Sequence, residues 1–375
     1  MRRLIAAALI LLLLLDGCTR GAGAGEAAPN EIRAVWISYI DLSMEKEKDR
    51  SESAFRKKAK NMLHRLADNG YNTVFLHVRP FGDALYRSDL FSFSRILTGM
   101  TGEDPLYDPL SVFCSLAALR GIAVHGWINP FRVCAEKELL ARPEWDRMRR
   151  LYISKPSAFC EVNGTLYLDP AAQQTRRLLL DCVRELMKNY PLDGIHIDDY
   201  FYPTTNIKID NAEYTAYRDA GGESTLSDWR RCVINTFVSQ MYCTVKSFGN
   251  NKIFSISPAL RIDKNKETLY ADVARWGACS GYCDWLIPQL YVGFRHEKYP
   301  FDDLLLQWRS LVKSDSVRLL AGLAAYKTGQ TDPYAGSGRE EWIRDTDILS
   351  RQIARVRETD GYSGFVLFSF YNIFN

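Results

Sequence analysis

Two adjacent carboxylates, Asp198 and Asp199, end a short apolar run near the middle of this 375-residue chain. The run, residues 194–197, alternates isoleucine with glycine and histidine, which is typical of a buried β-strand. Three aromatic residues and a proline follow at 200–203. Paired carboxylates beside aromatic rings at the end of a strand are the residue types that glycosidic-bond cleavage needs: one acid, one nucleophile or base, and rings that stack on sugars.

Strand-like and helix-like segments alternate along the rest of the chain. The expected strands are residues 33–40, 72–79, 122–129, 194–198, 252–258, 284–291, 318–325 and 363–370. The expected helices are residues 53–68, 109–120, 171–190, 228–246, 268–279, 301–312 and 340–358. This order predicts an α/β protein with a single (β/α)8 TIM barrel. A doubly wound open sheet is the alternative, but no glycine-rich phosphate turn follows the first strand.

The connections between these segments are asymmetric. Short turns lead into strands two to four, whereas residues 130–170 and 199–226 form long loops after strands three and four. Active sites of (β/α)8 barrels are built from the loops that follow the strands. The long loops therefore place the functional end of the barrel at the carboxyl ends of its strands, next to Asp198.

Strand alternation also predicts which side chains point into the barrel. The inward set is His77, Arg79, His125, Trp127, Asn129, His196, Asp198, Gln289 and Tyr291. Aromatic rings stack on pyranose faces, and amide and guanidinium groups pair with sugar hydroxyl groups. The alternative is that these residues form only a hydrogen-bonded polar layer inside the barrel, which we favour for the histidines.

The three inward histidines permit a second chemistry. His77, His125 and His196 lie on successive strands, and together with Asp198 they offer the donor set of a zinc-dependent hydrolase. However, each histidine lies below the end of its strand, and none belongs to a paired metal-binding motif. We therefore expect no metal and no other cofactor.

The N-terminus is typical of an export signal. A basic start at residues 1–3 precedes an apolar run at 4–15 that is too short to span a bilayer. Residues 1–18 are predicted to be a signal peptide whose lipobox ends at Cys18, the residue to be lipidated; secretion with cleavage nearby is the alternative. Residues 19–29 form a flexible tether, and residues 30–375 form the barrel domain. We expect an exported lipoprotein of the cell envelope.

Charge and cysteine usage add two further expectations. The net charge is only +3 and no lysine or arginine block follows the N-terminus, so nucleic acid is not an expected partner. Eight cysteines follow Cys18, and the pairing of Cys279 with Cys283, or of Cys134 with Cys160, stays open.

Two Asp-Pro pairs have the pattern of helix starts rather than of a catalytic site. Asp108 and Asp169 each precede a proline and a helical segment. Both aspartates are therefore expected to cap helix N-termini.

Several motifs resemble one known family. They are Arg33–Trp36, Asn72–Phe75, Val78–Pro80, Gly82–Tyr86, Asp108–Leu110, His125–Arg132, Leu168–Pro170, Asp193–Pro203, Asp228–Arg231, Ser257–Pro258 and Pro288–Tyr291. In this combination the chain is similar to the glycosyl hydrolase-like 10 family of bacterial barrel proteins. The family includes divisome-associated lipoproteins that cleave peptidoglycan glycan strands. The chain departs from the pattern at Ala259–Arg261, which affects expectations about sugar subsites.

The resemblance implies a glycoside hydrolase acting on an amino-sugar polymer outside the cytoplasm. It makes Asp198 and Asp199 the catalytic residues, with a polysaccharide partner and a membrane contact through Cys18. The implied cleft residues are Arg79, Asp83, Trp127, Asn129, Arg132, Tyr202, Gln289 and Tyr291. A glycan-binding lipoprotein without turnover is the non-enzymatic alternative.

The identity of the second carboxylate depends on the backbone at Asp199. Adjacent residues of an ideal strand point to opposite faces, so Asp198 and Asp199 cooperate only if the chain turns there. Otherwise Asp83 is the first choice. Substrate assistance ranks lower, because a chitinase-like Asp-Gly-x-Asp-x-Asp-x-Glu pattern would need a glutamate where this chain has Tyr200.

Overall fold

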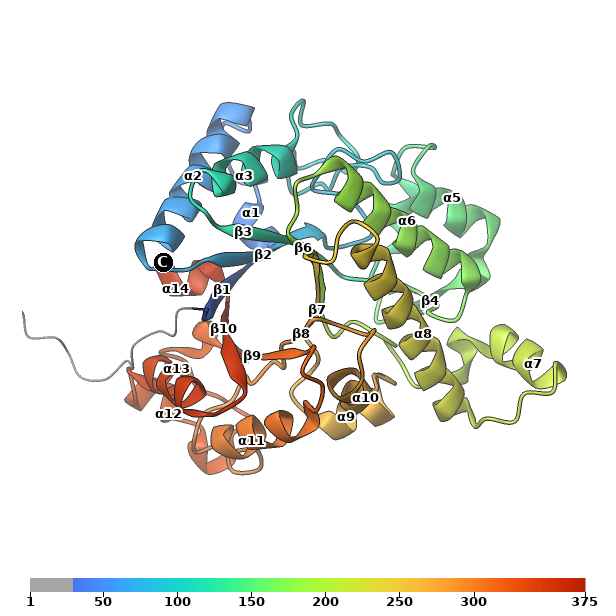
Figure 1. Cartoon of the computed structure of the whole chain (residues 1–375). Helices are drawn as coiled ribbons and strands as arrows, with labels where there is room; N and C mark the ends of the chain where they lie inside the picture. The colour runs from blue at the N-terminus through green and yellow to red at the C-terminus, as the bar shows by residue number, and fades with distance from the viewer. Residues whose placement is uncertain (1–29, 375) are drawn as a thin grey trace, which may run out of the picture.

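A closed barrel of eight parallel strands forms the centre of the molecule (Figure 1). The structure is a computed structural model and describes residues 30–374. The barrel strands are β1 (Ile32–Ile37), β2 (Thr73–Arg79), β3 (Ala123–Ile128), β6 (Gly194–Ile197), β7 (Ile253–Ile256), β8 (Trp285–Leu286), β9 (Arg318–Leu323) and β10 (Tyr362–Phe368). Pairing of β10 with β1 closes the barrel. The predicted fold class and all eight predicted strands are confirmed.

Helices surround the barrel as an outer ring (Figure 1). The long ones are α2 (Glu52–Asp68), α3 (Pro109–Ala118), α6 (Gln173–Asn189), α8 (Leu226–Lys246), α11 (Phe301–Leu311) and α13 (Ile348–Glu358). Shorter helices are α1 (Tyr39–Leu42), α9 (Ile262–Glu267), α10 (Val273–Ala278), α12 (Glu341–Arg344) and α14 (Phe370–Phe374). The predicted helix 340–358 is therefore divided in two, and 268–279 is reduced to α10.

Two apolar layers result from the alternation along the strands. Val74 and Leu76 of β2 pack outward against the helices, whereas Phe75 points into the barrel. The interior layer consists of Ile32, Ala34, Trp36, Phe75, Trp127, Trp285, Ile287, Leu320 and Val366. Large aromatic side chains thus fill the barrel below its carboxyl end, where they support the polar groups above them.

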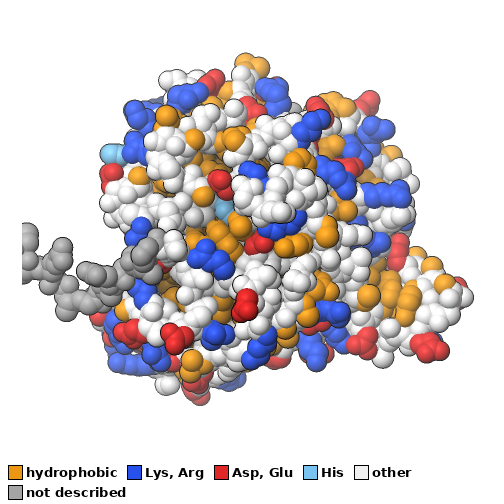
Figure 2. All heavy atoms as spheres, viewed as in Figure 1, with side chains coloured by type: hydrophobic (Ala, Val, Ile, Leu, Met, Phe, Trp, Pro, Cys, Tyr) orange, Lys and Arg blue, Asp and Glu red, His pale blue; other side chains and the backbone are white. Residues whose placement is uncertain are grey.

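The long loops after β3 and β6 carry their own secondary structure. The first contains α4 (Glu136–Leu140), α5 (Arg147–Ser154) and an antiparallel hairpin, β4 (Phe159–Val162) with β5 (Thr165–Leu168). The second contains α7 (Asn211–Asp219), which projects from the barrel and has hydrophobic side chains gathered over it (Figures 1 and 2). The sequence predicted these loops but not the hairpin.

A buried ion pair fixes the loop after β6. The Arg230 guanidinium of α8 binds both carboxylate oxygens of Asp210, at 2.8 and 2.6 Å, and both side chains are fully buried. Arg230 also donates to the carbonyl oxygens of Thr205 and Asn206 and to the Tyr270 hydroxyl. Arg230 therefore fixes residues 205–210 of the loop that follows β6.

The two predicted N-caps have different outcomes. Asp108 caps α3 by accepting a hydrogen bond from the Ser111 amide at 3.1 Å, as predicted. The prediction for Asp169 is wrong: α6 is preceded by Ala172, and Asp169 instead accepts from the Ala171 amide in the turn before the helix. The second carboxylate oxygen of Asp169 is buried without a hydrogen-bond partner.

The burial of Asp169 alters its titration. Loss of hydration is the main cause that raises the pKa of Asp169 to about 8, and the nearby charges of Glu213 and Asp210 add to it. These surroundings therefore favour the protonated, uncharged form of Asp169 at neutral pH.

Some predictions concern residues outside this description. The signal peptide 1–18, the lipidated Cys18 and the tether 19–29 lie outside residues 30–374. Within the described part of the chain, none of the helices has the length and apolar character needed to cross a membrane. The eight cysteines after Cys18 are free thiols, so neither considered disulfide is present.

Candidate active site

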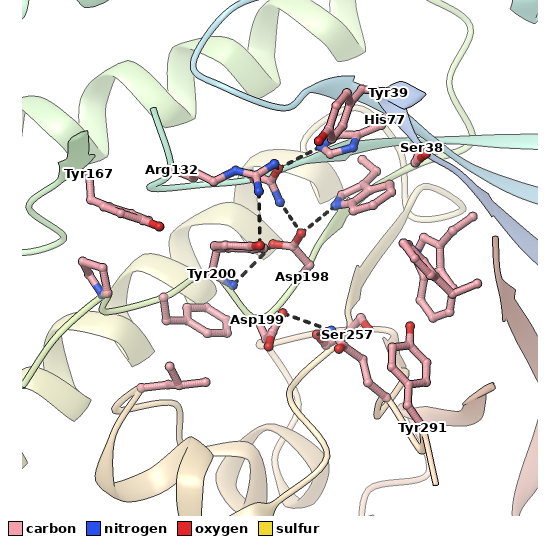
Figure 3. Close-up of a pocket in the computed structure, with 18 of the residues that line it drawn as sticks. Ser38, Tyr39, His77, Arg132, Tyr167, Asp198, Asp199, Tyr200, Ser257 and Tyr291 are labelled. Carbon is pink, nitrogen blue, oxygen red and sulfur yellow. Dashed lines mark hydrogen bonds between the residues drawn. The ribbon is translucent and has the colours of Figure 1, made fainter. Parts of the chain in front are cut away.

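A cavity of about 660 Å³ opens at the carboxyl end of the barrel (Figure 3). Its walls come from the ends of β1, β2, β3, β6, β7, β8 and β10 and from the β4–β5 hairpin. The lining residues are Trp36, Ser38, Tyr39, Ile40, His77, Trp127, Asn129, Arg132, Tyr167, Asp198–Pro203, Ser257, Lys264, Thr268, Leu269, Gln289, Tyr291 and Phe368. The cavity therefore lies where the loop lengths predicted it.

Asp198 lies at the centre of this cavity, one residue beyond the end of β6. Its Oδ2 accepts hydrogen bonds from Trp127 Nε1 at 3.0 Å and from Asn129 Nδ2. Its Oδ1 accepts only a long hydrogen bond of 3.4 Å from the Tyr200 amide. One carboxylate oxygen is thus held by β3, while the other is more weakly bound and available for proton transfer.

The surroundings of Asp198 favour its protonated form. Loss of hydration is the main cause that raises the pKa of Asp198 to about 7, and the adjacent charge of Asp199 contributes in the same direction. Arg132 and the hydrogen bond from Trp127 act in the opposite direction. A carboxyl group with a pKa near neutrality can donate a proton and then take it back, as general acid–base catalysis requires.

Asp199 lines the same cavity because the backbone bends at this residue. The bend includes a hydrogen bond from the Phe201 amide to the Asp199 carbonyl, at 2.9 Å. Gln289 Nε2 donates to Asp199 Oδ1 at 3.1 Å. Burial raises the pKa of Asp199, whereas this hydrogen bond lowers it. The turn that cooperation of the two carboxylates requires is therefore present, and Asp83 is not needed as a substitute.

Arg132 connects the two long loops across the cavity (Figure 3). Its Nη2 donates to Asn129 Oδ1 at 2.8 Å and its Nη1 to the Tyr200 hydroxyl at 3.1 Å. The guanidinium also stacks over the rings of Tyr200 and Phe81. Asn129 consequently presents its oxygen to Arg132 and His77 and its amide nitrogen to Asp198. The side-chain amide can satisfy all these partners in only one orientation.

Two of the predicted cleft residues lie outside the cavity lining. Arg79 is fully buried, donates to the carbonyl oxygens of Asn129 and Pro130, and packs over Phe91. The cause is an irregularity between His77 and Arg79, where β2 gains one residue relative to β3 and the expected alternation is broken. Asp83 is also buried, and it accepts from the Phe81 amide in its own turn. Neither residue can contact a ligand in the cavity.

The other predicted cleft residues do line the cavity, although not equally. Trp127, Asn129, Arg132, Gln289 and Tyr291 are all present around the two carboxylates. Tyr202 also lines it, but this ring is 1% exposed and packs edge-on against Tyr270. The role of each in binding or catalysis stays a prediction; the structure makes Tyr202 a support of the wall rather than its surface.

The three histidines are interior packing residues, contrary to the metal-site alternative. Trp36 Nε1 donates to His196 Nε2 at 3.0 Å, and His196 Nδ1 pairs with Ser255, so both ring nitrogens are engaged. His77 stacks on Trp127 at 3.7 Å, and His125 stacks on Trp285 at 4.9 Å. Across residues 30–374, no three His, Cys, Asp or Glu side chains are grouped to hold a metal ion.

The histidines are also uncharged. Burial lowers the pKa of His77 and His196 well below the usual value and that of His125 to about 3. The barrel interior beneath the carboxylates is therefore neutral and aromatic.

Several cavity residues were not predicted from the sequence. Ser38, Tyr39 and Ile40 follow β1, Tyr167 belongs to the unexpected hairpin, and Lys264 begins the wall formed by α9. The position of residues 38–40 at the carboxyl end of an expected strand was a usable signal. Nothing in the spacing of Tyr167 or Lys264 indicated that they reach the cleft.

Comparison with known proteins identifies the family. A family model described as glycosyl hydrolase-like 10 matches residues 31–335, which include all the cavity residues except Phe368. The chain belongs to the glycosyl hydrolase-like 10 family.

Two relatives illustrate the extent of this family relationship. Glycosyl hydrolase YngK of Bacillus subtilis (strain 168) is 30% identical over 363 residues, which cover 91% of this chain and 69% of that protein. Glycosyl hydrolase DigH of Escherichia coli (strain K12) is 30% identical over 335 residues, which cover 82% of this chain and 73% of that protein. The similarity therefore extends over most of the barrel.

Solved structures confirm the architecture. The glycoside hydrolase domain of PgaB (BpsB) from Bordetella bronchiseptica superposes with a TM-score of 0.60 at 14% identity, covering 92% of this chain and 95% of that domain. The α-amylase of Geobacillus thermoleovorans gives a TM-score of 0.52 at 12% identity, covering 92% and 71%. At these identities the likeness concerns the fold alone. The barrel of this glycosyl hydrolase-like 10 protein is one that glycoside hydrolases use.

Proposed function

We propose that the chain is a glycoside hydrolase that cleaves an amino-sugar polymer, namely the glycan strands of peptidoglycan. The observation that carries this proposal is the pair Asp198 and Asp199, side by side in one cavity, with the pKa of Asp198 raised to about 7. Glycoside hydrolysis needs two carboxyl groups of different protonation state. The family membership supports the reaction class, and the names of the relatives agree with it.

The two carboxyl groups receive different roles from their surroundings. Asp198, protonated near neutral pH, donates its proton to the glycosidic oxygen as the bond to the anomeric carbon breaks. Asp199, held by Gln289, either attacks the anomeric carbon as the nucleophile or is the base that activates the attacking water. In either case a water molecule supplies the hydroxyl group and the proton that complete the two product ends.

The walls of the cavity suit a sugar polymer. Trp36, Tyr200, Tyr291 and Phe368 provide ring surfaces, and Asn129, Arg132 and Gln289 provide hydrogen-bonding groups. Pyranose rings have apolar faces and polar edges, so they bind to surfaces of this mixed kind. The residues of the cleft support a sugar ligand, and the family resemblance supports peptidoglycan as its source.

The decisive experiment is digestion of purified glycans with mass-spectrometric analysis of the products. Peptidoglycan stripped of its stem peptides, intact peptidoglycan and chitin oligosaccharides would be compared. We expect fragments from stripped peptidoglycan, and a loss of about a hundredfold or more in Asp198→Asn. Asp303→Asn, an equivalent change on the exposed face of α11, is the matched control and retains activity.

Two other results would contradict the proposed activity or the proposed substrate. A wild-type protein that binds the glycan but releases no product, with binding unchanged in Asp198→Asn, would be a glycan-binding protein without turnover. Fragments from chitin oligosaccharides alone would contradict the proposed substrate but not the reaction.

We also propose that the protein is exported and lipid-anchored at Cys18. The support is the basic start, the apolar run and the cysteine at the end of the run. Replacement of Cys18 by Ser should release the protein from the membrane fraction of a bacterial host, and mass spectrometry of wild type should show the lipid. Membrane association that persists in Cys18→Ser would contradict the anchor.

A further inference from the structure

A second cavity adjoins the cleft on the side of β1. It has a volume of about 380 Å³ and lies between α1, α2 and α14, which are neighbours in the outer ring (Figure 1). Ile40 lines both cavities, so they meet at this side chain. We propose that this second cavity binds a further sugar unit of the same polymer, which runs from the cleft across Ile40. The inference rests on the proposed function and adds a subsite to it.

The exposed apolar surface of this cavity has two principal members. Ile40 is 65% exposed and Tyr371 is 59% exposed, although both belong to elements packed on the barrel. Buried Met62 lies beneath them, while Asn61 and Lys58 of α2 provide a polar edge. An aromatic and an aliphatic surface with amide and ammonium groups beside it matches the apolar face and hydroxyl edge of a pyranose.

The two exposed side chains are held in fixed positions. Asp41 is a buried carboxylate that accepts hydrogen bonds from the Ser38 amide and hydroxyl, both at 2.7 Å, within the capping box of α1. The other oxygen of Asp41 accepts from the Tyr371 amide at 2.9 Å. One carboxylate therefore ties α14 to α1, so that the positions of Ile40 and Tyr371 are fixed relative to each other before a ligand arrives. A binding surface fixed in advance loses less entropy when the ligand binds.

The continuity of the second cavity with the cleft indicates that both bind the same polymer. A polymer bound across Asp198 extends beyond the cleft in both directions, and Ile40 is the point where one wall opens into the second cavity. Lys58 and Arg65 of α2 face the same cavity, and both already have partners. Lys58 donates to the Ser43 carbonyl oxygen and pairs with Glu47, and Arg65 lies over the Phe374 ring. The negative charges nearby are thus balanced by these cations, and the surface accepts a neutral or acidic sugar.

Binding as a function of chain length tests the inference. In the Asp198→Asn background, which prevents cleavage, affinities for stripped-peptidoglycan oligosaccharides of increasing length would be measured by calorimetry. We expect Tyr371→Ala to weaken binding of the long oligosaccharides by about tenfold and to leave that of the shortest unchanged. Tyr334→Ala is the matched control, because Tyr334 is 85% exposed and lines neither cavity.

A second variant covers the case in which Tyr371→Ala disturbs α14. Asn61→Ala changes the opposite wall, on the exposed side of α2, and should produce the same length-dependent loss. Equal weakening at all lengths, or none at any length, in both variants would overturn the inference while leaving the proposed function intact. A change in oligomeric state in Tyr371→Ala, without a change in affinity, would assign the surface to a second copy of the chain instead. Absence of glycan binding at every length in the Asp198→Asn parent would overturn the proposed function as well.

Discussion

Trp127 donates its indole N–H to Asp198 across 3.0 Å and thereby joins β3 to the residue that follows β6. The same ring stacks on His77 at 3.7 Å, so its orientation is fixed from below. The hydrogen bond lowers the pKa of Asp198, against the larger effect of burial. The titration of the proposed acid therefore depends on a neighbouring strand.

Trp127→Phe should test this dependence. The phenyl ring keeps part of the stacking on His77 but removes the donor, so the pKa of Asp198 should rise. We expect the alkaline limb of the pH profile to move upward by about one pH unit and kcat/KM to fall about tenfold.

The matched control for this change is Trp276→Phe. Trp276 is a buried tryptophan whose indole donates to Asn235, outside the cavity. Its replacement should leave the pH profile in place. An unchanged profile in Trp127→Phe would show that the hydrogen bond does not tune Asp198.

The wild-type pH profile should be bell-shaped. Asp198 must be protonated, and its pKa of about 7 places the alkaline limb near pH 7. Asp199 must be ionised, and burial raises its pKa, so the acidic limb should lie above the range of an ordinary aspartate. Steady-state rates on stripped peptidoglycan between pH 3 and 9 provide the measurement. In Asp199→Asn we expect the acidic limb to disappear along with most of the activity.

Asp169 should make stability depend on pH. Its pKa is about 8 in the folded protein and about 3.9 in the unfolded chain, so the folded state holds the extra proton between these values. The contribution of Asp169 to the free energy of unfolding is fully present below about pH 4 and is lost as the pH rises toward 8. Asp169→Asn should therefore gain stability relative to wild type from pH 5 to pH 8, by a few kcal/mol at most. Urea unfolding at several pH values measures the difference, and a constant difference would contradict the prediction.

Removal of one partner of the buried ion pair Arg230–Asp210 should lower the stability of the fold. Arg230→Met leaves the Asp210 carboxylate buried without its partner, which costs about 3–5 kcal/mol. The double variant Arg230→Met with Asp210→Leu should recover much of this loss. Arg218→Met, on exposed α7, should change stability by less than about 0.5 kcal/mol. A double variant as unstable as the single one would show that the contacts of Arg230 with the loop carbonyls matter more than the pair.

The fold could be predicted from the sequence because the barrel strands are marked by apolar runs that alternate with helix-like segments. The least accurate strand was residues 284–291, of which only Trp285–Leu286 is paired as a strand. Pro288 has no amide hydrogen to donate, so the ladder is interrupted there and resumes as a single bridge at Gln289.

The site could be predicted in part. Asp198, Trp127, Asn129 and Gln289 follow from strand alternation, and the structure brings them into one cavity. The prediction that Arg79 lines the cleft is wrong because a single extra residue in β2 reverses the alternation of its side chains. Such an irregularity has no sequence signal. Tyr167 depends on the folding of a long loop, which strand and helix periodicity do not describe.

The stacked histidines of the barrel interior have a consequence for acid tolerance. His77, His125 and His196 stay neutral in the folded protein, whereas in the unfolded chain each binds a proton below about pH 6.5. Unfolding thus takes up three protons at the histidines and releases protons from Asp169 and Asp198. At about pH 5 the three protons taken up outnumber the two released, so stability should rise with pH there; the two exchanges nearly cancel at about pH 6, where stability should be greatest. A protein built in this way is most stable in mildly acidic surroundings.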